Sequence, residues 1–508
     1  MKPSAKHEGA PPARASDEKS PEEASADEGA AADEGAEAGA REGSPPAEPP
    51  PPLEKLRRSK AISRLSVHGW IAGLAGAFTV LVMGWVAAGR DVMTKGWGLF
   101  GAGDPALATA FPLLVIAAVM LTVEIGIRIK VDRGKIIKMP EGLRSGGFGA
   151  FVRECIAVYA VEVGLLYLAL AVYQLANEYG FAKNAEYYRP WFSVMRYFFW
   201  IYVYGGLPYV MLTRALQHDP RADKRQAAFT VMKAGRALLA RVSPASYEAP
   251  EPFDGNDRTA ILGLFVKLFF VPIMTVFFAD QFSHLIKNVG YLNDLLFPTP
   301  GRTTTFGIRD FYNVSFTVIF SIDVGLAWAG YVISSRWIKN GMYSVEPTVL
   351  GWVVALLSYP PFNRVFGFYF STPGENGFLS ISSHTAVTFL ALCSVLSFVG
   401  YMSATVCFGL RFSNLTHRGI ITTGPYAIVR HPAYAAKNFS WWCVMLPYAL
   451  YDAGTHRSAG PLLQVLGLVM MSSIYYMRAI TEERHLGLDP EYQAYAKKVP
   501  YRFIPGIV

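Results

Sequence analysis

Two polar stretches near the carboxyl end of the sequence carry residue types that can bind a small molecule. They hold cations, an imidazole, a phenol and two adjacent carboxylates: Arg430, His431, Tyr434, Arg478, Glu482 and Glu483. A nucleotide-like cofactor requires this combination, because carboxylates accept from ribose hydroxyls and aromatic faces attract a cationic group or an adenine. Structural roles fit the same residues: Arg430 and His431 as membrane anchors, Glu482 as an i,i+4 partner of Arg478, and the tyrosines as an interfacial belt.

The first polar stretch lies in a loop whose backbone is constrained by glycine and proline. Gly424-Pro425 predicts a turn, and Pro432 disfavours helical geometry at His431. We therefore expect the imidazole to project sideways from the start of the next helix. That helix and the following one form a predicted hairpin, so the loop and the two carboxylates are expected to lie side by side.

The composition indicates a membrane protein. Hydrophobic residues make up 52% of the chain and charged residues only 17%. Apolar runs of about 20 residues, such as 71–88 and 107–123, are long enough to cross a hydrocarbon core roughly 30 Å thick. We predict an all-α, polytopic integral membrane protein. The composition excludes a collagen, a coiled coil and a secreted disulfide scaffold.

About ten transmembrane helices are predicted, and lysine and arginine accumulate in alternate loops between them. The spans lie at approximately 68–88, 106–128, 155–176, 191–213, 259–279, 311–334, 348–369, 384–410, 439–452 and 460–480. Because basic loops face the cytoplasm, both termini and the loop at 411–437 are expected there. An acidic, alanine-rich start without an evident targeting signal suggests a bacterial inner membrane.

Three regions follow from these patterns. Residues 1–64 are predicted to be a disordered tail, since residues 1–52 carry 12 acidic against 5 basic residues and almost no large apolar side chain. Residues 65–345 form an N-terminal transmembrane region of about six helices with no assigned role, and residues 346–508 form a C-terminal module.

The basic excess beside apolar segments favours the lipid bilayer over nucleic acid as partner. The four cysteines lack metal-site spacing, and no metal is expected. The oligomeric state is left open.

Other charged residues occur within or beside the predicted spans. The segment 222–242 alternates apolar and basic residues as an amphipathic helix does, and such a helix lies either on the membrane surface or on the protein's own face. Four ionisable residues fall inside spans: Glu124, Glu162, Lys267 and Asp323. They indicate either polar contacts between helices, which is the simpler interpretation, or a transport pathway.

The order of the C-terminal motifs resembles the signature of the isoprenylcysteine carboxyl methyltransferase family, which phospholipid methyltransferases share in a looser form. The similar residues are Thr423-Gly424-Pro425-Tyr426, Val429-Arg430-His431-Pro432, Tyr434, Glu482-Glu483, Asp489-Pro490-Glu491-Tyr492 and Tyr495. They cover roughly 384–505, about a quarter of the chain. The first seven predicted spans have no counterpart in smaller family members. Lys437 also departs from the small or aliphatic residues that relatives commonly carry there.

The resemblance implies methyl transfer from S-adenosylmethionine to a lipophilic acceptor at the cytoplasmic membrane face. A prenylcysteine-like carboxylate, an isoprenoid and a phospholipid amine all fit as acceptors. The implied cofactor-binding residues are Gly424, Pro425, Tyr426, Arg430, His431, Pro432, Tyr434, Glu482 and Glu483, and the implied catalytic residues are His431, Tyr434 and Arg478. In this interpretation Arg478 orients the two carboxylates, His431 positions the cofactor, and a short helix capped by Asp489 closes over the pocket.

Two rival functions remain open at this point. An integral-membrane sterol-type reductase resembles the same C-terminal architecture and uses NADPH. A non-catalytic transporter or scaffold that retains the module would instead use the charged residues of the first seven spans, together with the Pro360-Pro361 break.

Overall fold

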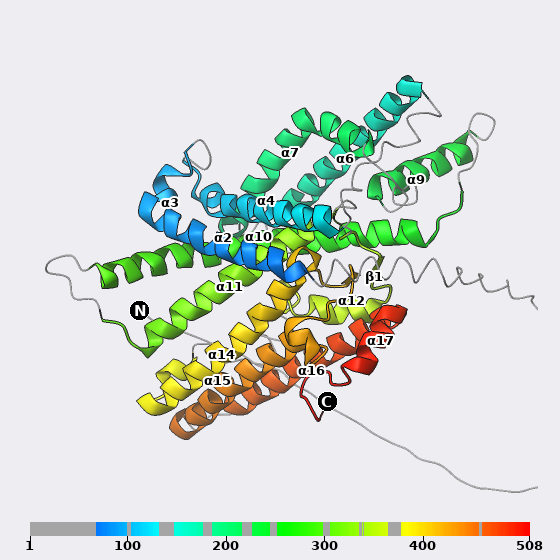
Figure 1. Cartoon of the computed structure of the whole chain (residues 1–508). Helices are drawn as coiled ribbons and strands as arrows, with labels where there is room; N and C mark the ends of the chain where they lie inside the picture. Colours follow the sequence, from blue (N-terminus) through cyan, green and yellow to red (C-terminus); the bar gives the residue numbers. More distant parts are fainter. Residues whose placement is uncertain are drawn as a thin grey trace, which may run out of the picture. The chain divides into compact units, whose positions relative to one another are not determined.

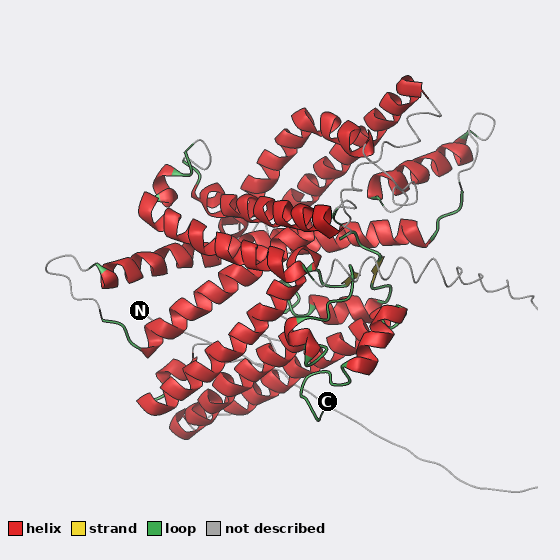
Figure 2. Cartoon of the chain, viewed as in Figure 1, coloured by secondary structure: helices red, strands yellow, loops and turns green. Residues whose placement is uncertain are grey.

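The computed structural model is helical almost throughout (Figures 1 and 2). It describes residues 68–98, 103–131, 147–175, 185–215, 226–243, 251–297, 305–334, 338, 340–363, 377–456 and 460–507. The predicted disordered tail at 1–64 lies outside the described residues. Within the described ranges, strands are limited to one two-residue pair, so the all-α prediction is confirmed.

Seven helices in the described part of the chain are long and apolar enough to cross a membrane. They are α2 (Gly69–Arg90), α4 (Pro105–Val131), α6 (Gly147–Leu175), α10 (Gly255–Leu296), α11 (Ile308–Val332), α14 (His384–Phe408) and α16 (Gly460–Leu486). They confirm a polytopic membrane protein. Two further predicted spans lie in long helices, α7 (Ala185–Ala215) and α15 (Pro432–His456).

The predicted continuous span at 348–369 is wrong. Helix α12 (Val349–Leu356) has only eight residues, and turns follow it as far as Asn363. Pro360 and Pro361 explain the break, because proline lacks a backbone donor and disfavours helical geometry in the residue before it.

The membrane helices pack around two aromatic cores that share α11. The first core joins α2, α4, α10 and α11 through side chains such as Val80, Ile116 and Phe270. The second joins α11 to α14, α15 and α16, which run side by side in Figure 1, through Phe398, Trp441 and other side chains. Helix α11 thereby connects the N-terminal helices to the C-terminal module.

A close backbone approach joins α2 to α14. A Cβ atom at Gly73 would lie only 2.0 Å from the Val406 carbonyl oxygen, so a side chain there would separate the two helices. Small residues allow this kind of contact between membrane helices. The N-terminal and C-terminal regions are therefore packed together and not merely linked.

Short elements cover the end of the bundle at which α14 and α16 terminate. Strand β1 (Ser344–Val345) pairs antiparallel with β2 (Thr416–His417). The other short elements there are η2 (Gly409–Arg411), η3 (Gly424–Ala427) and α17 (Pro490–Lys498). Elsewhere, α3 (Val92–Lys95) follows α2 and η1 (Gly377–Ser380) precedes α14. Asp489 caps α17 as predicted, since its side chain accepts from Glu491 N at 2.7 Å.

The predicted amphipathic helix is α9 (Ala227–Val242), and it packs against α6 and α10. Lys233 of α9 forms a 2.5 Å ion pair with Asp257 of α10. Leu238, Leu239 and Val242 remain exposed. One face of α9 thus packs on the protein itself through Phe229 and Met232, while these three apolar side chains face outward.

The ionisable residues inside the predicted spans contact neighbouring helices. Glu124 of α4 pairs with Arg411 at 2.6 Å, and Glu162 of α6 accepts from Tyr202 of α7. Lys267 donates to the Val332 carbonyl at 3.3 Å. Asp323 accepts from Tyr401 at 2.9 Å and from Thr405 at 2.5 Å. These are the inter-helix contacts that the structural interpretation predicted.

Candidate functional site

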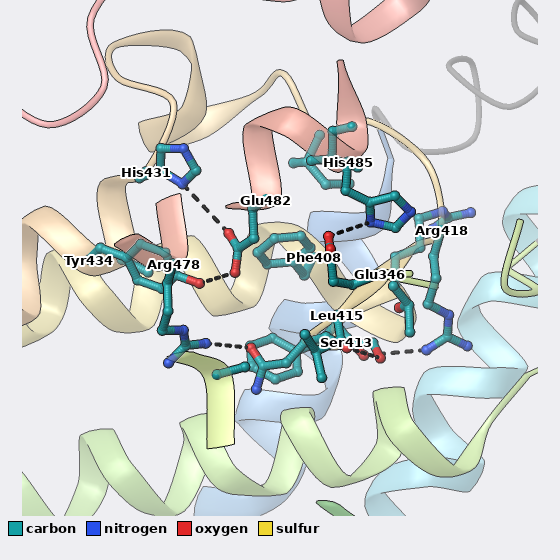
Figure 3. A pocket seen from close by; sticks show the side chains of 18 of the residues that line it. Glu346, Phe408, Ser413, Leu415, Arg418, His431, Tyr434, Arg478, Glu482 and His485 are labelled. Carbon is teal, nitrogen blue, oxygen red and sulfur yellow. Dashed lines mark hydrogen bonds and ion pairs between the residues drawn. The ribbon is translucent and has the colours of Figure 1, made fainter. Parts of the chain in front are cut away.

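A cavity of about 250 Å³ lies at the end of the C-terminal helices (Figure 3). Its walls come from α12, the end of α14, the loop at 411–421, the start of α15, the end of α16 and α17. The volume approaches the roughly 300–1,000 Å³ typical of small-molecule sites. Residues that are far apart in the sequence therefore enclose one space.

Gly409 ends α14 and turns the chain into the cavity wall. Its φ of +52° is a left-handed conformation, which glycine adopts without steric cost. A Cβ at this position would also lie 2.4 Å from the Gly69 carbonyl oxygen of α2. Glycine is thus required both by the turn and by the contact with the N-terminal region.

Tyr434, His431 and Glu482 form a compact group beside the cavity. The Tyr434 hydroxyl donates to Glu482 Oε1, while Glu482 Oε2 lies 3.7 Å from His431 Nδ1. The His431 and Tyr434 rings stack with their centroids 5.5 Å apart. Pro432 begins α15, so His431 precedes the helix and its ring lies over the first helical turn, as the sequence predicted. All three residues line the cavity.

Glu483 has a different environment from its neighbour Glu482. Its Oε1 accepts from Arg430 Nε at 2.8 Å and lies 3.1 Å from His431 Nε2, and its Oε2 accepts from Arg502 Nε at 2.9 Å. Arg430 also donates to the carbonyls of Val499 and Pro500. Glu483 therefore fastens the C-terminal segment to the loop, and it is not one of the cavity-lining residues.

Arg478 is held by aromatic rings and an amide. Its guanidinium carbon lies 5.0 Å from the Tyr434 ring centroid and 5.1 Å from that of Tyr475. Its Nη2 donates to Asn414 Oδ1 at 3.0 Å. The sequence-based interpretation had Arg478 orienting Glu482 and Glu483, whereas the hydrogen bond in the structure goes to Asn414. Arg478 instead fixes the cavity wall formed by Tyr434 and Tyr475.

The candidate residues divide into two groups. Tyr426, Arg430, His431, Tyr434, Arg478 and Glu482 line the cavity. Gly424, Pro425, Pro432 and Glu483 lie in the adjacent backbone without lining it. Gly424 has a φ of +63°, and a Cβ there would lie 2.5 Å from Cys407 Sγ, so this glycine shapes the loop.

Two buried arginines lie in the cavity wall, and both interact with other groups of the protein. Arg411 is paired with Glu124 of α4. Arg418 donates to one hydroxyl and four backbone carbonyls, those of Ser334, Asn340, Gly330, Phe412 and Ile333. Burial lowers the pKa of Arg418, and the nearby charge of Arg411 lowers it further. Both cations serve to hold the loop against the membrane helices.

Burial also dominates the electrostatics of other groups around the loop. It raises the pKa of Tyr426 well above its ordinary value, and Tyr495, whose hydroxyl donates to the Tyr426 carbonyl at 2.7 Å, adds to the shift. Burial lowers the pKa of His417, an effect that nearby Asp489 opposes. Tyr426 therefore stays a neutral aromatic wall at physiological pH.

Several cavity residues were not identified from the sequence. Glu346, Asn414 and His485 line the cavity, but no motif connects them in the chain. Glu346 lies 138 positions before Arg484, to which it is nevertheless bonded at 3.0 Å. Only the run of polar residues at 411–418 gave a signal, and it did not distinguish Asn414 from its neighbours.

Residues 380–499 match one known protein family. Its description is "Protein of unknown function (DUF1295)". The matched range contains α14–α17 and the loop between α14 and α15, and hence most of the cavity wall. No curated protein and no solved structure matches the chain. The description of this family names no activity, and the match does not support the narrower resemblance to isoprenylcysteine carboxyl methyltransferases.

Proposed function

We propose that the protein is a membrane-bound methyltransferase that uses S-adenosylmethionine and methylates a lipophilic acceptor at the cytoplasmic membrane face. The observation that carries this proposal is the carboxylate of Glu482. One of its oxygens is fixed by Tyr434, and the other lies beside His431 in an aromatic cavity. This arrangement gives a cofactor hydroxyl or amino group an oriented acceptor.

The residues around the cavity fit the chemistry of this cofactor. Glu482 would accept from its hydroxyl or amino groups, and the faces of Tyr426, Tyr434 and Tyr475 would bind its adenine or its positive charge. When bound, the cofactor supplies an electrophilic methyl group. The protein then has mainly to position the reactants and exclude water.

The position of the cavity favours a lipophilic acceptor. Two of its walls, α14 and α16, are helices long and apolar enough to cross a membrane. Beside it, α12 exposes the apolar side chains of Val349, Leu350 and Val353. An acceptor with an apolar tail can therefore place the tail among these helices and its reactive end in the cavity.

Calorimetric titration of the detergent-purified protein with S-adenosylmethionine and, separately, with NADPH tests this function. We expect S-adenosylmethionine to bind, and Glu482→Gln to weaken that binding at least tenfold, about 1.4 kcal/mol. Glu154→Gln is the matched control, because Glu154 lies on α6 with a half-exposed side chain and pairs with Arg214 away from the cavity. Binding of NADPH instead would favour a reductase. If folded protein binds neither cofactor, both the methyltransferase and the reductase function are refuted.

A further inference from the structure

A second carboxylate, Glu346, lines the same cavity and is almost completely buried. Its Oε1 accepts from Thr348 N at 3.1 Å, from the Thr348 hydroxyl, and from Arg484 Nη2 at 3.0 Å. Its Oε2 accepts no hydrogen bond in the described part of the chain, and its nearest ionic partner is His485 Nδ1 at 3.9 Å. One oxygen is therefore fixed while the other is available.

The backbone around Glu346 is built to hold this carboxylate. Thr348 caps α12 by accepting from Gly351 N at 3.2 Å, which places the first turn of α12 on the Glu346 side chain. A Cβ at Gly351 would lie 2.3 Å from Glu346 Cγ. Any residue larger than glycine at 351 would thus displace the carboxylate.

A row of polar side chains leads away from Glu346. His485, which is 8% exposed, lies next to Glu346, and its Nε2 is 2.8 Å from Ser344 Oγ. Ser344 is only partly buried. Figure 3 shows His485 directed at Glu346 on the cavity wall. The remaining charged neighbours are Arg484 on the same helix and the His417–Asp489 pair, whose Nε2 and Oδ2 atoms are 3.6 Å apart.

We infer that Glu346 is the base that removes a proton from the methyl acceptor, and that the acceptor is therefore an X–H nucleophile: a thiol, hydroxyl or amine. This inference rests on the proposed function. The acceptor atom X forms the new bond to the methyl carbon, the carbon–sulfur bond breaks, and its electron pair stays on the cofactor sulfur. The X–H proton passes to Glu346 and then through His485 and Ser344 to solvent.

The charges around the cavity favour this acceptor class over a carboxylate. A carboxylate acceptor has no proton to remove, and it would lie near both Glu346 and Glu482, which costs energy at low dielectric. Among the cations that line the cavity, Arg411 pairs with Glu124 and Arg430 with Glu483. Arg418 donates to backbone carbonyls, Arg478 donates to Asn414, and the Lys437 ammonium lies over the rings of Tyr401 and Trp441.

The test compares decanethiol, decylamine, decanol and decanoate, which differ only in the reactive group, as acceptors of a radiolabelled methyl group. We expect transfer to at least one of the first three, and Glu346→Gln to lower kcat about a hundredfold or more while S-adenosylmethionine binding changes by less than about twofold. Gly351→Ala, which moves Glu346 without altering it, is expected to act in the same direction. Glu154→Gln serves again as the matched control.

Infrared difference spectroscopy gives a readout that needs no turnover. When decanethiol binds to protein loaded with S-adenosylhomocysteine, its S–H group should donate a hydrogen bond to Glu346, which shifts the S–H stretch to lower frequency. Glu346→Gln should reduce that shift, and Glu154→Gln should keep it. A purely structural role for Glu346 would leave the S–H stretch the same in the wild-type protein and in Glu346→Gln.

The outcomes separate the two levels of the proposal. Wild-type protein that fails to bind S-adenosylmethionine refutes the proposed function itself. Protein that binds the cofactor but methylates only decanoate, or none of the four probes, refutes the base assignment alone. Methylation of the thiol, alcohol or amine at an unchanged rate in Glu346→Gln, with the shift of the S–H stretch also unchanged, would overturn it as well.

Discussion

Asp323, which lies between membrane helices, and the two carboxylates at the cavity are hydrogen-bonded to different degrees. Asp323 receives a hydrogen bond on each carboxylate oxygen, from Tyr401 and Thr405. At the cavity, Glu346 and Glu482 each have one oxygen fixed by hydrogen bonds and a second one whose nearest ionic partner is a histidine nitrogen more than 3.5 Å away. The first arrangement satisfies both oxygens of a carboxylate between helices, whereas the second leaves one oriented oxygen available to a ligand.

This difference shows why burial of a charge is a weak indicator of function. Glu124 and Glu346 are equally buried, at 2% exposure each. Glu124 joins two regions of the protein through Arg411, while Glu346 borders a space. What separates them is access to the cavity, which sequence position does not reveal.

The largest expected effect is at the Glu124–Arg411 pair. Glu124→Ala leaves a cation buried without its partner, so we expect a loss of about 3–5 kcal/mol of unfolding free energy. Thermal unfolding in detergent measures it. Because an apolar pair avoids the uncompensated charge, Glu124→Leu combined with Arg411→Met should recover most of the loss. A stable Glu124→Ala protein would show that the pair does not join the two regions.

Arg418→Lys should have the next largest effect. Lysine retains the charge but cannot reach all the carbonyl acceptors that the planar guanidinium reaches, so we expect a loss of about 2–3 kcal/mol. Chemical denaturation followed by tryptophan fluorescence measures it. If Arg418 only supplied charge, the lysine variant would match the wild type.

The adjacent residues Glu482 and Glu483 allow a direct comparison of a cavity-lining carboxylate with one that is held by cations. Glu483→Gln weakens contacts with Arg430, His431 and Arg502, and should lower stability by about 1.5–3 kcal/mol. Glu482→Gln keeps an acceptor for Tyr434 and should lower it by under about 0.5 kcal/mol. Thermal unfolding of the two variants, measured in parallel, gives both losses of stability. Equal losses would contradict the assignment of a structural role to Glu483 and a ligand-binding role to Glu482.

The smallest expected effect is the pH dependence contributed by His417. Burial holds its folded-state pKa below the ordinary value of 6.5, so the unfolded chain binds the proton more readily. Stability should therefore fall as the pH drops below 6.5. Comparing wild type with His417→Gln between about pH 7.5 and about pH 5.5 isolates this contribution from that of the carboxylates. The variant should lose less stability over that range; an identical loss would contradict the assignment.

The sequence alone determined the membrane class and the local features of the polar loop. Apolar runs of membrane-spanning length are visible in any window of the chain, and a proline fixes a helix start or break wherever it stands. The non-helical position of His431 before Pro432, the N-cap at Asp489 and the proximity of the polar loop to the carboxylates at 482 and 483 were predicted. These depend on short-range sterics, or on the neighbouring ends of two helices in a hairpin.

Tertiary structure decided the rest, because the remaining contacts join separate segments of the chain. The bond between Glu346 and Arg484 and the pairing of Glu124 with Arg411 arise from helix packing, which no local pattern encodes. The separation of Glu482 from Glu483 had the same origin. Adjacent residues on a helix point in different directions, and only the position of the C-terminal segment determined which carboxylate was covered by Arg502 and which faced the cavity.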